Sequence, residues 1–201
     1  MQSEVGFRRL VNFSDAVVAI AITLLILPLV DRASSIGATG IGSFLSDNET
    51  KLLAFLLSFV VIGRFWWGQH QVFERVKSYN ALLVWGMFVW LLSIVFLPFP
   101  TELISSAQGG ARAATYAIYI GTLLVASMAV LVQQLAVVHW PELQKDEHRG
   151  TSTTDGAVIL TVLMAAALVV AVFVPVIGLW ALLLLMLTTP LERIMDRRRP
   201  T

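Results

Sequence analysis

Long apolar runs separated by short polar stretches dominate this sequence of 201 residues. A helix needs about 20 mostly apolar residues to cross the hydrocarbon core of a bilayer. Six runs approach or exceed this length, at residues 10–30, 52–70, 80–100, 113–138, 156–175 and 176–192. The last two are almost continuous, and Pro175 and Gly178 near their junction predict a tight helical hairpin. The pattern therefore predicts one all-α integral membrane domain over residues 1–201, with six transmembrane helices.

Composition agrees with a membrane protein and narrows the possible chemistry. Hydrophobic residues make up 57% of the chain and charged residues 13%, whereas soluble domains carry about 25% charged residues. A net charge of +1 gives no broad basic surface for nucleic acid. Cysteine is absent from the sequence, which excludes disulfides and thiol catalysis. The three histidines lack the spacing of a metal site, so we expect no bound metal and no cofactor.

The positions of lysine and arginine predict the orientation of the helices, because these residues are enriched in cytoplasmic loops. If the N-terminus is cytoplasmic, an even number of spans returns the C-terminus to the same side. Only Arg32, Lys51 and Arg112, of the 14 basic residues, then lie on the far side. We therefore expect both termini to be cytoplasmic.

The first apolar run opens with the polar sequence "RLVNFSD" at residues 9–15. The apolar stretch from Ala16 to Val30 would form about 22 Å of helix, which is shorter than a hydrocarbon core of about 30 Å. The helix must therefore begin earlier, and Ser14 and Asp15 fall inside the membrane boundary, where they must face protein or water. A cleaved signal peptide fits less well, because the run is long and Asp15 lies near its start.

Helical spacing separates two faces of this first segment. At about 100° per residue, Asp15 points away from the face that carries Ile20, so we expect Asp15 to bind neighbouring helices. By periodicity alone, the face of Ile20 is most simply a packing surface. Pro28 cannot donate a hydrogen bond to the carbonyl of Leu24, so it kinks the helix or frees that carbonyl. Towards the C-terminal end of the segment, this face continues within about 60° of Ile20 through Thr23, Leu24, Leu27 and Asp31.

The motif Arg9-x-x-x-Phe13-Ser14-Asp15, at the start of the first of six spans and followed by "AITLLILPL", resembles the signature of the transmembrane protein 175 family. These proteins are potassium channels of lysosomes and bacteria. The resemblance covers the whole chain in topology and the first span residue by residue. Bacterial members carry one six-span unit per chain and form homotetramers. The resemblance therefore implies a homotetrameric potassium channel in a bacterial plasma membrane.

The resemblance also implies a role for the face of Ile20. In the family the first helix lines a central pore, and a ring of bulky aliphatic side chains five residues after the motif aspartate forms the constriction. That position is Ile20 here, with further apolar rings at Leu24 and Leu27 and a threonine layer, implicated in potassium preference, at Thr23. Such rings close a pore by dewetting. Because the sequence lacks a TVGYG-like carbonyl loop, we expect a moderate preference for potassium over sodium.

Polar residues of the second and third spans complete the site that the resemblance implies. In the family, the motif serine and aspartate join a network with aromatic, histidine and asparagine residues. We interpret this network as a buried brace for the pore helix, because charged groups at membrane depth must be paired. Its expected members in this sequence are Arg9, Phe13, Ser14, Asp15, Trp66 or Trp67, His70 and Asn80.

Two further charges have open alternatives. Asp31 forms either an acidic ring that concentrates cations at the outer mouth of the pore or a solvated carboxylate beside Arg32. Arg64 either snorkels to the cytoplasmic boundary, which we favour, or joins the brace around Asp15.

Two other functions fit parts of the sequence. A secondary ion or solute transporter would also use an intramembrane aspartate such as Asp15, but it usually has discontinuous helices and inverted repeats. Pro28 is the one interruption that we find, and no repeat accompanies it. A membrane enzyme would need a nucleophile–base set, and His70 would have to serve Ser14. We therefore expect a channel and not an enzyme, with membrane lipid, potassium ions and copies of itself as partners.

Overall fold

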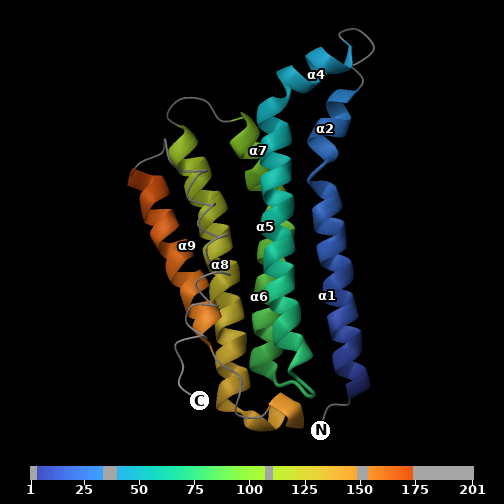
Figure 1. Cartoon of the computed structure of the whole chain (residues 1–201), viewed down its shortest axis with the longest axis vertical. Coiled ribbons are helices and arrows are strands. Elements are labelled where there is room, and N and C mark those ends of the chain that lie inside the picture. Colours follow the sequence, from blue (N-terminus) through green and yellow to red (C-terminus); the bar gives the residue numbers. More distant parts are fainter. Residues whose placement is uncertain (1–3, 34–39, 107–110, 149–153, 174–201) are drawn as a thin grey trace.

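The computed structural model describes residues 4–33, 40–106, 111–148 and 154–173, and its regular elements in these ranges are helices (Figure 1). Five segments of these ranges are long and apolar enough to cross a membrane, and they confirm the first five predicted spans. The predicted sixth span, 176–192, and the hairpin at Pro175 and Gly178 lie outside the described residues. The segments are Val5–Arg32, Glu49–Glu74, Ala81–Ser106, Arg112–His139 and Asp155–Phe173.

Two of these segments are each divided into two helices by a short break. In both, a proline lies in the first turn of the second helix, Pro28 in one and Pro98 in the other. Proline lacks the N–H that a helix interior requires, but it fits the first turn, where the N–H has no partner within the helix. The helices are α1 (Glu4–Leu24), α2 (Leu27–Arg32), α4 (Ile41–Asp47), α5 (Glu49–Glu74), α6 (Ala81–Phe96), α7 (Pro98–Ser106), α8 (Ala111–His139), η2 (Pro141–Leu143), η3 (Asp146–His148) and α9 (Asp155–Phe173).

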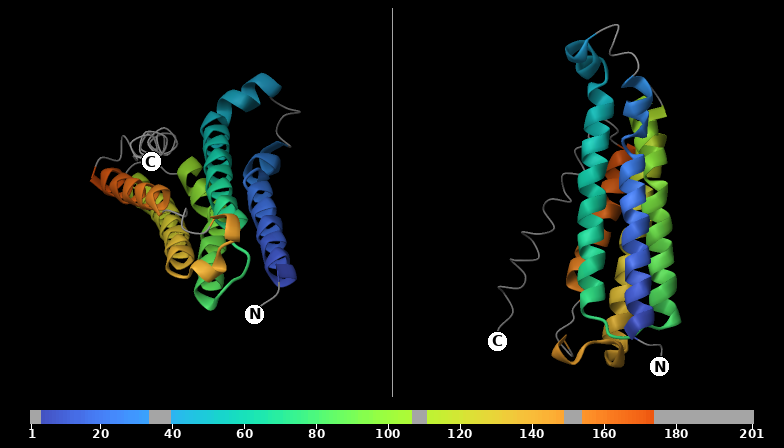
Figure 2. Two further views of the ribbon diagram at one scale, coloured as in Figure 1. Left: turned by 60° about the horizontal axis from the view of Figure 1, so that its bottom comes forward. Right: turned by 90° about the vertical axis from the view of Figure 1, so that its right-hand side faces the viewer.

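The long helices form a bundle in which α1 and α9 lie at opposite edges (Figures 1 and 2). The helix α1 contacts α6 and α5, whereas α8 packs between α6 and α9. In the most apolar window of the first and last described spans, 28% of the residues are buried, against 44% in the spans of α6 and α8. The first span therefore leaves much of its apolar surface without a partner among the described residues.

The core of the bundle lies between α5, α6 and α8, where Phe65, Trp90 and Tyr119 are fully buried. An amide pair crosses this core. Nε2 of Gln69 donates to Oε1 of Gln133 at 2.6 Å, and Nε2 of Gln133 returns a hydrogen bond at 3.2 Å. Both amides are satisfied by this exchange, which joins α5 to α8 inside an apolar surrounding.

A glycine permits α6 to approach this amide pair. A Cβ atom on Gly86 would lie 2.7 Å from Cγ of Gln133, closer than side chains pack in real structures. Since a larger side chain would have to displace Gln133, the packing of α6 on α8 depends on a residue without Cβ at this position.

The start of the first span is anchored at the end of the bundle where the N-terminus lies (Figure 1). Phe7 is buried, with its ring edge-on to Phe73 at 5.6 Å and stacked on Tyr79 at 5.9 Å. The segment between Phe73 and Tyr79 is itself held by the loop after α8, since the N–H of Lys77 donates to the carbonyl of Leu143 at 2.8 Å. The base of α1 therefore rests on a surface that α5 and two loops build together.

Candidate functional site

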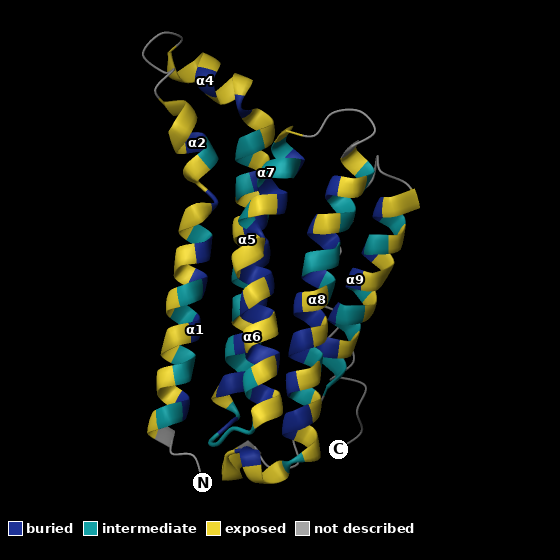
Figure 3. Ribbon diagram, turned by 180° about the vertical axis from the view of Figure 1, so that it is seen from behind, coloured by how far each residue is buried: buried dark blue, intermediate teal, exposed yellow. Residues whose placement is uncertain are grey.

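One side of the first span is apolar and faces away from the other described helices. The exposed fractions are 61% for Ile20, 43% for Leu24 and 50% for Leu27, and Thr23 and Asp31 are exposed as well. Figure 3 shows that exposed positions recur along the outer side of α1 and α2. The structure thus brings the five residues of the predicted pore face together on one surface at the edge of the bundle. The opposite, buried side of the span carries Phe7, Ser14, Val18, Ala21, Leu25 and Leu29.

The hydroxyl of Thr23 is directed back to its own helix. It donates a hydrogen bond of 2.7 Å to the carbonyl of Ile20. Because the hydroxyl proton is used in this bond, the Thr23 oxygen can act towards its surroundings only as a hydrogen-bond acceptor. The surface between Ile20 and Leu24 thus carries an oxygen that can meet a cation or its water shell.

The break between α1 and α2 falls within this same surface. The amides of Leu25 and Ile26 make only long bonds to carbonyls three residues earlier, at 3.3 and 3.4 Å. Among the described residues, no backbone hydrogen bond reaches the carbonyl of Leu24, because Pro28 has no N–H to donate to it. The kink predicted at Pro28 is present, and the carbonyl of Leu24 lies outside the helical hydrogen-bond pattern.

A polar and aromatic contact holds the middle of α1 to α5. The indole Nε1 of Trp66 donates to Oδ1 of Asp15 at 2.8 Å. The ring of His70 stacks on Trp66 with 5.4 Å between centroids, and its Nε2 lies 3.3 Å from Oε1 of Glu74. Trp66, His70 and Glu74 are spaced by four residues, so they share one face of α5. Asp15 therefore binds α5 on a side of α1 that differs from the face of Ile20.

The structure leaves other predicted members outside this contact. Arg9 is exposed, and no ion pair of Arg9 occurs among the described residues. Asn80 instead caps α6, since its Oδ1 accepts from the N–H of Leu83 at 2.9 Å. The signal for this role was available, because asparagine directly before an apolar helix is a preferred N-cap. Trp67 is 54% exposed and lies beside Trp66 without a hydrogen bond to Asp15.

Two motif residues extend the packing of α1. Ser14 is buried on the inner side of the helix. The ring of Phe13, half exposed, lies 6.5 Å from that of Phe88 on α6.

Arg64, the other charge at membrane depth, is half buried on α5.

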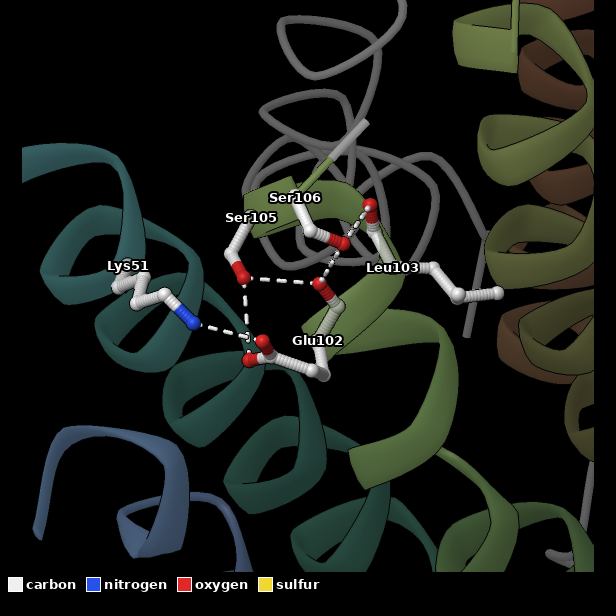
Figure 4. Close-up of polar contacts among 5 residues, drawn as sticks. All are labelled: Lys51, Glu102, Leu103, Ser105 and Ser106. Atoms are coloured by element: carbon white, nitrogen blue, oxygen red, sulfur yellow. Dashed lines mark hydrogen bonds and ion pairs between the residues drawn. The ribbon is translucent and has the colours of Figure 1, made fainter. Parts of the chain in front are cut away.

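One charged pair was missed by the sequence reasoning. Nζ of Lys51, at the start of α5, lies 2.6 Å from Oε1 of Glu102 on α7 (Figure 4). The sequence pattern predicts Lys51 only as a basic residue on the far side of the membrane, and it does not single out Glu102. The available signal was a pair of opposite charges near the ends of two spans, on the same predicted side of the membrane.

Metal ligands do not gather around this surface. In the described ranges, no group of three or more His, Cys, Asp or Glu side chains is placed to hold a metal ion.

Comparison with known proteins bears on what such a surface is for. A family model described as "Endosomal/lysosomal potassium channel TMEM175" matches residues 9–98. A potassium channel of Streptomyces collinus is 33% identical over 141 residues, which are 70% of this chain and 66% of that protein. A crystal structure of a lysosomal potassium-selective channel TMEM175 homolog from Chamaesiphon minutus superposes with a TM-score of 0.78 at 25% identity, covering 94% of this chain and 98% of that one. The chain belongs to the TMEM175 family.

The match to TMEM175 falls on the part of the chain that carries the site. Residues 9–98 include the motif at Arg9 to Asp15, the predicted pore face of α1 and α2, and the whole of α5 with Trp66 and His70. A second curated relative, a potassium channel of Chamaesiphon minutus, is 39% identical over 106 residues, or 52% of this chain and 51% of that protein. The aligned segments thus span about half to two thirds of these relatives' lengths. The TMEM175 family consists of ion channels, not enzymes, and this chain is an integral membrane protein.

Proposed function

We propose that this chain is a potassium channel, formed by four copies that surround a central pore with their first spans. The observation that carries the proposal is the apolar face of α1 and α2, which is exposed at the edge of the bundle, while the opposite face is held by α5 and α6. The family and its bacterial relatives described above, which are potassium channels, support potassium as the permeant ion.

Side chains on this face account for gating and selectivity in the proposed pore. Rings of Ile20, Leu24 and Leu27 from four copies form constrictions that exclude water when narrow and conduct when wet. An ion passing such a ring must shed part of its hydration shell, and potassium does so more easily than sodium. The acceptor oxygen of Thr23, about one helical turn after Ile20, compensates part of the lost hydration. We therefore propose a moderate preference for potassium.

The distribution of charge supports the proposed orientation. Arg32 and Lys51 lie in elements at the end of the bundle opposite the N-terminus, as does Asp31 (Figure 1). Under the proposal this end faces away from the cytoplasm. Four copies of Asp31 then form an acidic ring that concentrates cations at the outer mouth. We place the protein in a bacterial plasma membrane with both termini in the cytoplasm.

The contact of Asp15 with Trp66 serves as a structural brace in this proposal. It holds α1 against α5 from the side opposite Ile20, so that the apolar face stays directed to the pore axis. A conducting role for Asp15 is disfavoured, because its carboxylate is turned to the indole of Trp66 rather than to the exposed face.

The reversal potential tests the proposed function. The purified protein is placed in a planar bilayer with potassium on one side and sodium on the other. A current that reverses close to the potassium equilibrium potential is expected. A flux that saturates and requires a second coupled ion would instead identify a secondary transporter and overturn the proposal. Cross-linking of the same sample tests the tetramer, and a highest species of one or two copies would refute it.

A further inference from the structure

The pair of Lys51 and Glu102 is a partly buried charge contact between two helices, α5 and α7. Side-chain exposure is 12% for Lys51 and 39% for Glu102. The hydroxyl of Ser105 shares its one proton between the backbone carbonyl of Glu102, at 2.8 Å, and the other carboxylate oxygen of Glu102, at 3.0 Å (Figure 4). An ammonium group largely removed from water is costly unless a counter-charge stays in place. The geometry of α5 and α7 at this level is therefore tied to the pair.

The pair lies on the buried side of the break between α1 and α2. A cavity of about 10 Å³ separates the two, enough for about one water molecule. Leu25, Pro28 and Leu29 line it from the first span, and Lys51 and Glu102 line it from α5 and α7. The buried side of the break thus faces the charged pair across this cavity, and the exposed side carries Leu24 and Leu27.

Local helix geometry does not fix the direction of α2. The break has only two long backbone bonds, at 3.3 and 3.4 Å, and none to the carbonyl of Leu24 among the described residues. The helix α2 has six residues and packs against α5. Its direction relative to α1 must therefore be set by what it packs against.

We propose that Lys51, Glu102 and Ser105 form a positioning brace that sets the angle between α2 and α1, and thereby the relative placement of Leu24 and Leu27 in the pore. The inference rests on the proposed channel function. When the brace is lost, the apolar side chains of α2 gather at the pore axis to exclude water, and the channel closes more often.

Two substitutions that remove one charge each separate this role from simple electrostatics. Lys51→Met removes a positive charge near the mouth, and Glu102→Gln removes a negative one. If the charges act only through their field on cations, conductance rises in the first variant and falls in the second. If they position α2, both variants lower the open probability, by about two- to thirtyfold. The double variant is then no worse than the worse single variant, since both remove the same interaction.

Single-channel recording in planar bilayers measures these effects. Ser105→Ala is a milder variant that removes one bond to Glu102, and a smaller fall in open probability is expected. Lys77→Met is the matched control, because Lys77 also pairs with a carboxylate, that of Asp146, but in loops at the other end of the bundle. Its open probability should equal that of the unmodified channel.

The outcomes distinguish a failure of the proposed positioning brace from a failure of the proposed channel function. Changes of opposite sign in Lys51→Met and Glu102→Gln, or open probabilities equal to that of Lys77→Met, would overturn the brace and leave the channel intact. Absence of current from the unmodified protein would instead contradict the proposed function. If a charge variant does not assemble, Ser105→Ala still decides, because an unaltered open probability there would refute the brace.

Discussion

The hydrogen bond from Trp66 to Asp15 offers the sharpest test of how the pore helix is held. Trp66→Phe keeps an aromatic ring against His70 but removes the donor that Asp15 accepts at 2.8 Å. A hydrogen bond to a charged group contributes about 1.5–3 kcal/mol. For a chain of this size we expect the melting temperature in detergent to fall by about 3–12 °C. Asp15→Asn keeps the acceptor and loses only the charge, so its smaller loss is expected at about 0.5–1.5 kcal/mol.

The neighbouring tryptophan provides the control for this prediction. Trp67→Phe makes the same chemical change one residue away, at a side chain that is 54% exposed and makes no hydrogen bond to Asp15. The assay is thermal unfolding of the purified protein, followed by the reversal potential of the assembled channel. Equal melting temperatures for the two variants would refute a stabilising role for the contact between Asp15 and Trp66. A shifted reversal potential in an intact tetramer of Trp66→Phe would show that Asp15 takes part in conduction.

Three further substitutions test the pore face and the packing behind it. Ile20→Asn should wet the proposed constriction and bring the potassium-to-sodium permeability ratio toward unity; an unchanged ratio would remove Ile20 from this role. Thr23→Ala should alter the same ratio by about two- to tenfold with normal assembly, and bilayer recording under bi-ionic conditions decides it. Gly86→Ala should lower the free energy of unfolding by about 1–3 kcal/mol, because its Cβ would meet Gln133 at 2.7 Å. Gly63→Ala, where a Cβ meets nothing within 4 Å, should show no such loss, and equal melting temperatures would contradict the packing argument.

Much of the architecture follows from local pattern. The lengths of the apolar runs predicted the first five spans, because the thickness of a bilayer sets how many apolar residues a helix needs. Pro28 predicted the break between α1 and α2 for a similarly local reason, since a missing N–H acts within one turn. Helical periodicity placed Ile20, Leu24 and Leu27 on one face before any partner was known.

The partners of each face were decided only by tertiary structure. The sequence offered Trp66 and Trp67 equally to Asp15, and the packing of α5 on α1 brings Trp66 to it. Asn80 matched the expected network in residue type, yet its position before α6 makes it a helix cap. A side chain near a helix start finds unpaired N–H groups there, and this local bond competes with any distant one.

The pair of Lys51 and Glu102 shows most clearly which features depend on tertiary structure alone. Lys51 and Glu102 are 51 residues apart in sequence, and no periodicity within either helix connects them. Their meeting requires α5 to begin and α7 to end at the same level of the bundle. Periodicity within one helix determines which residues share a face, because it depends on rise and twist alone. Which face meets which is determined by how all the helices exclude lipid and satisfy their buried charges together.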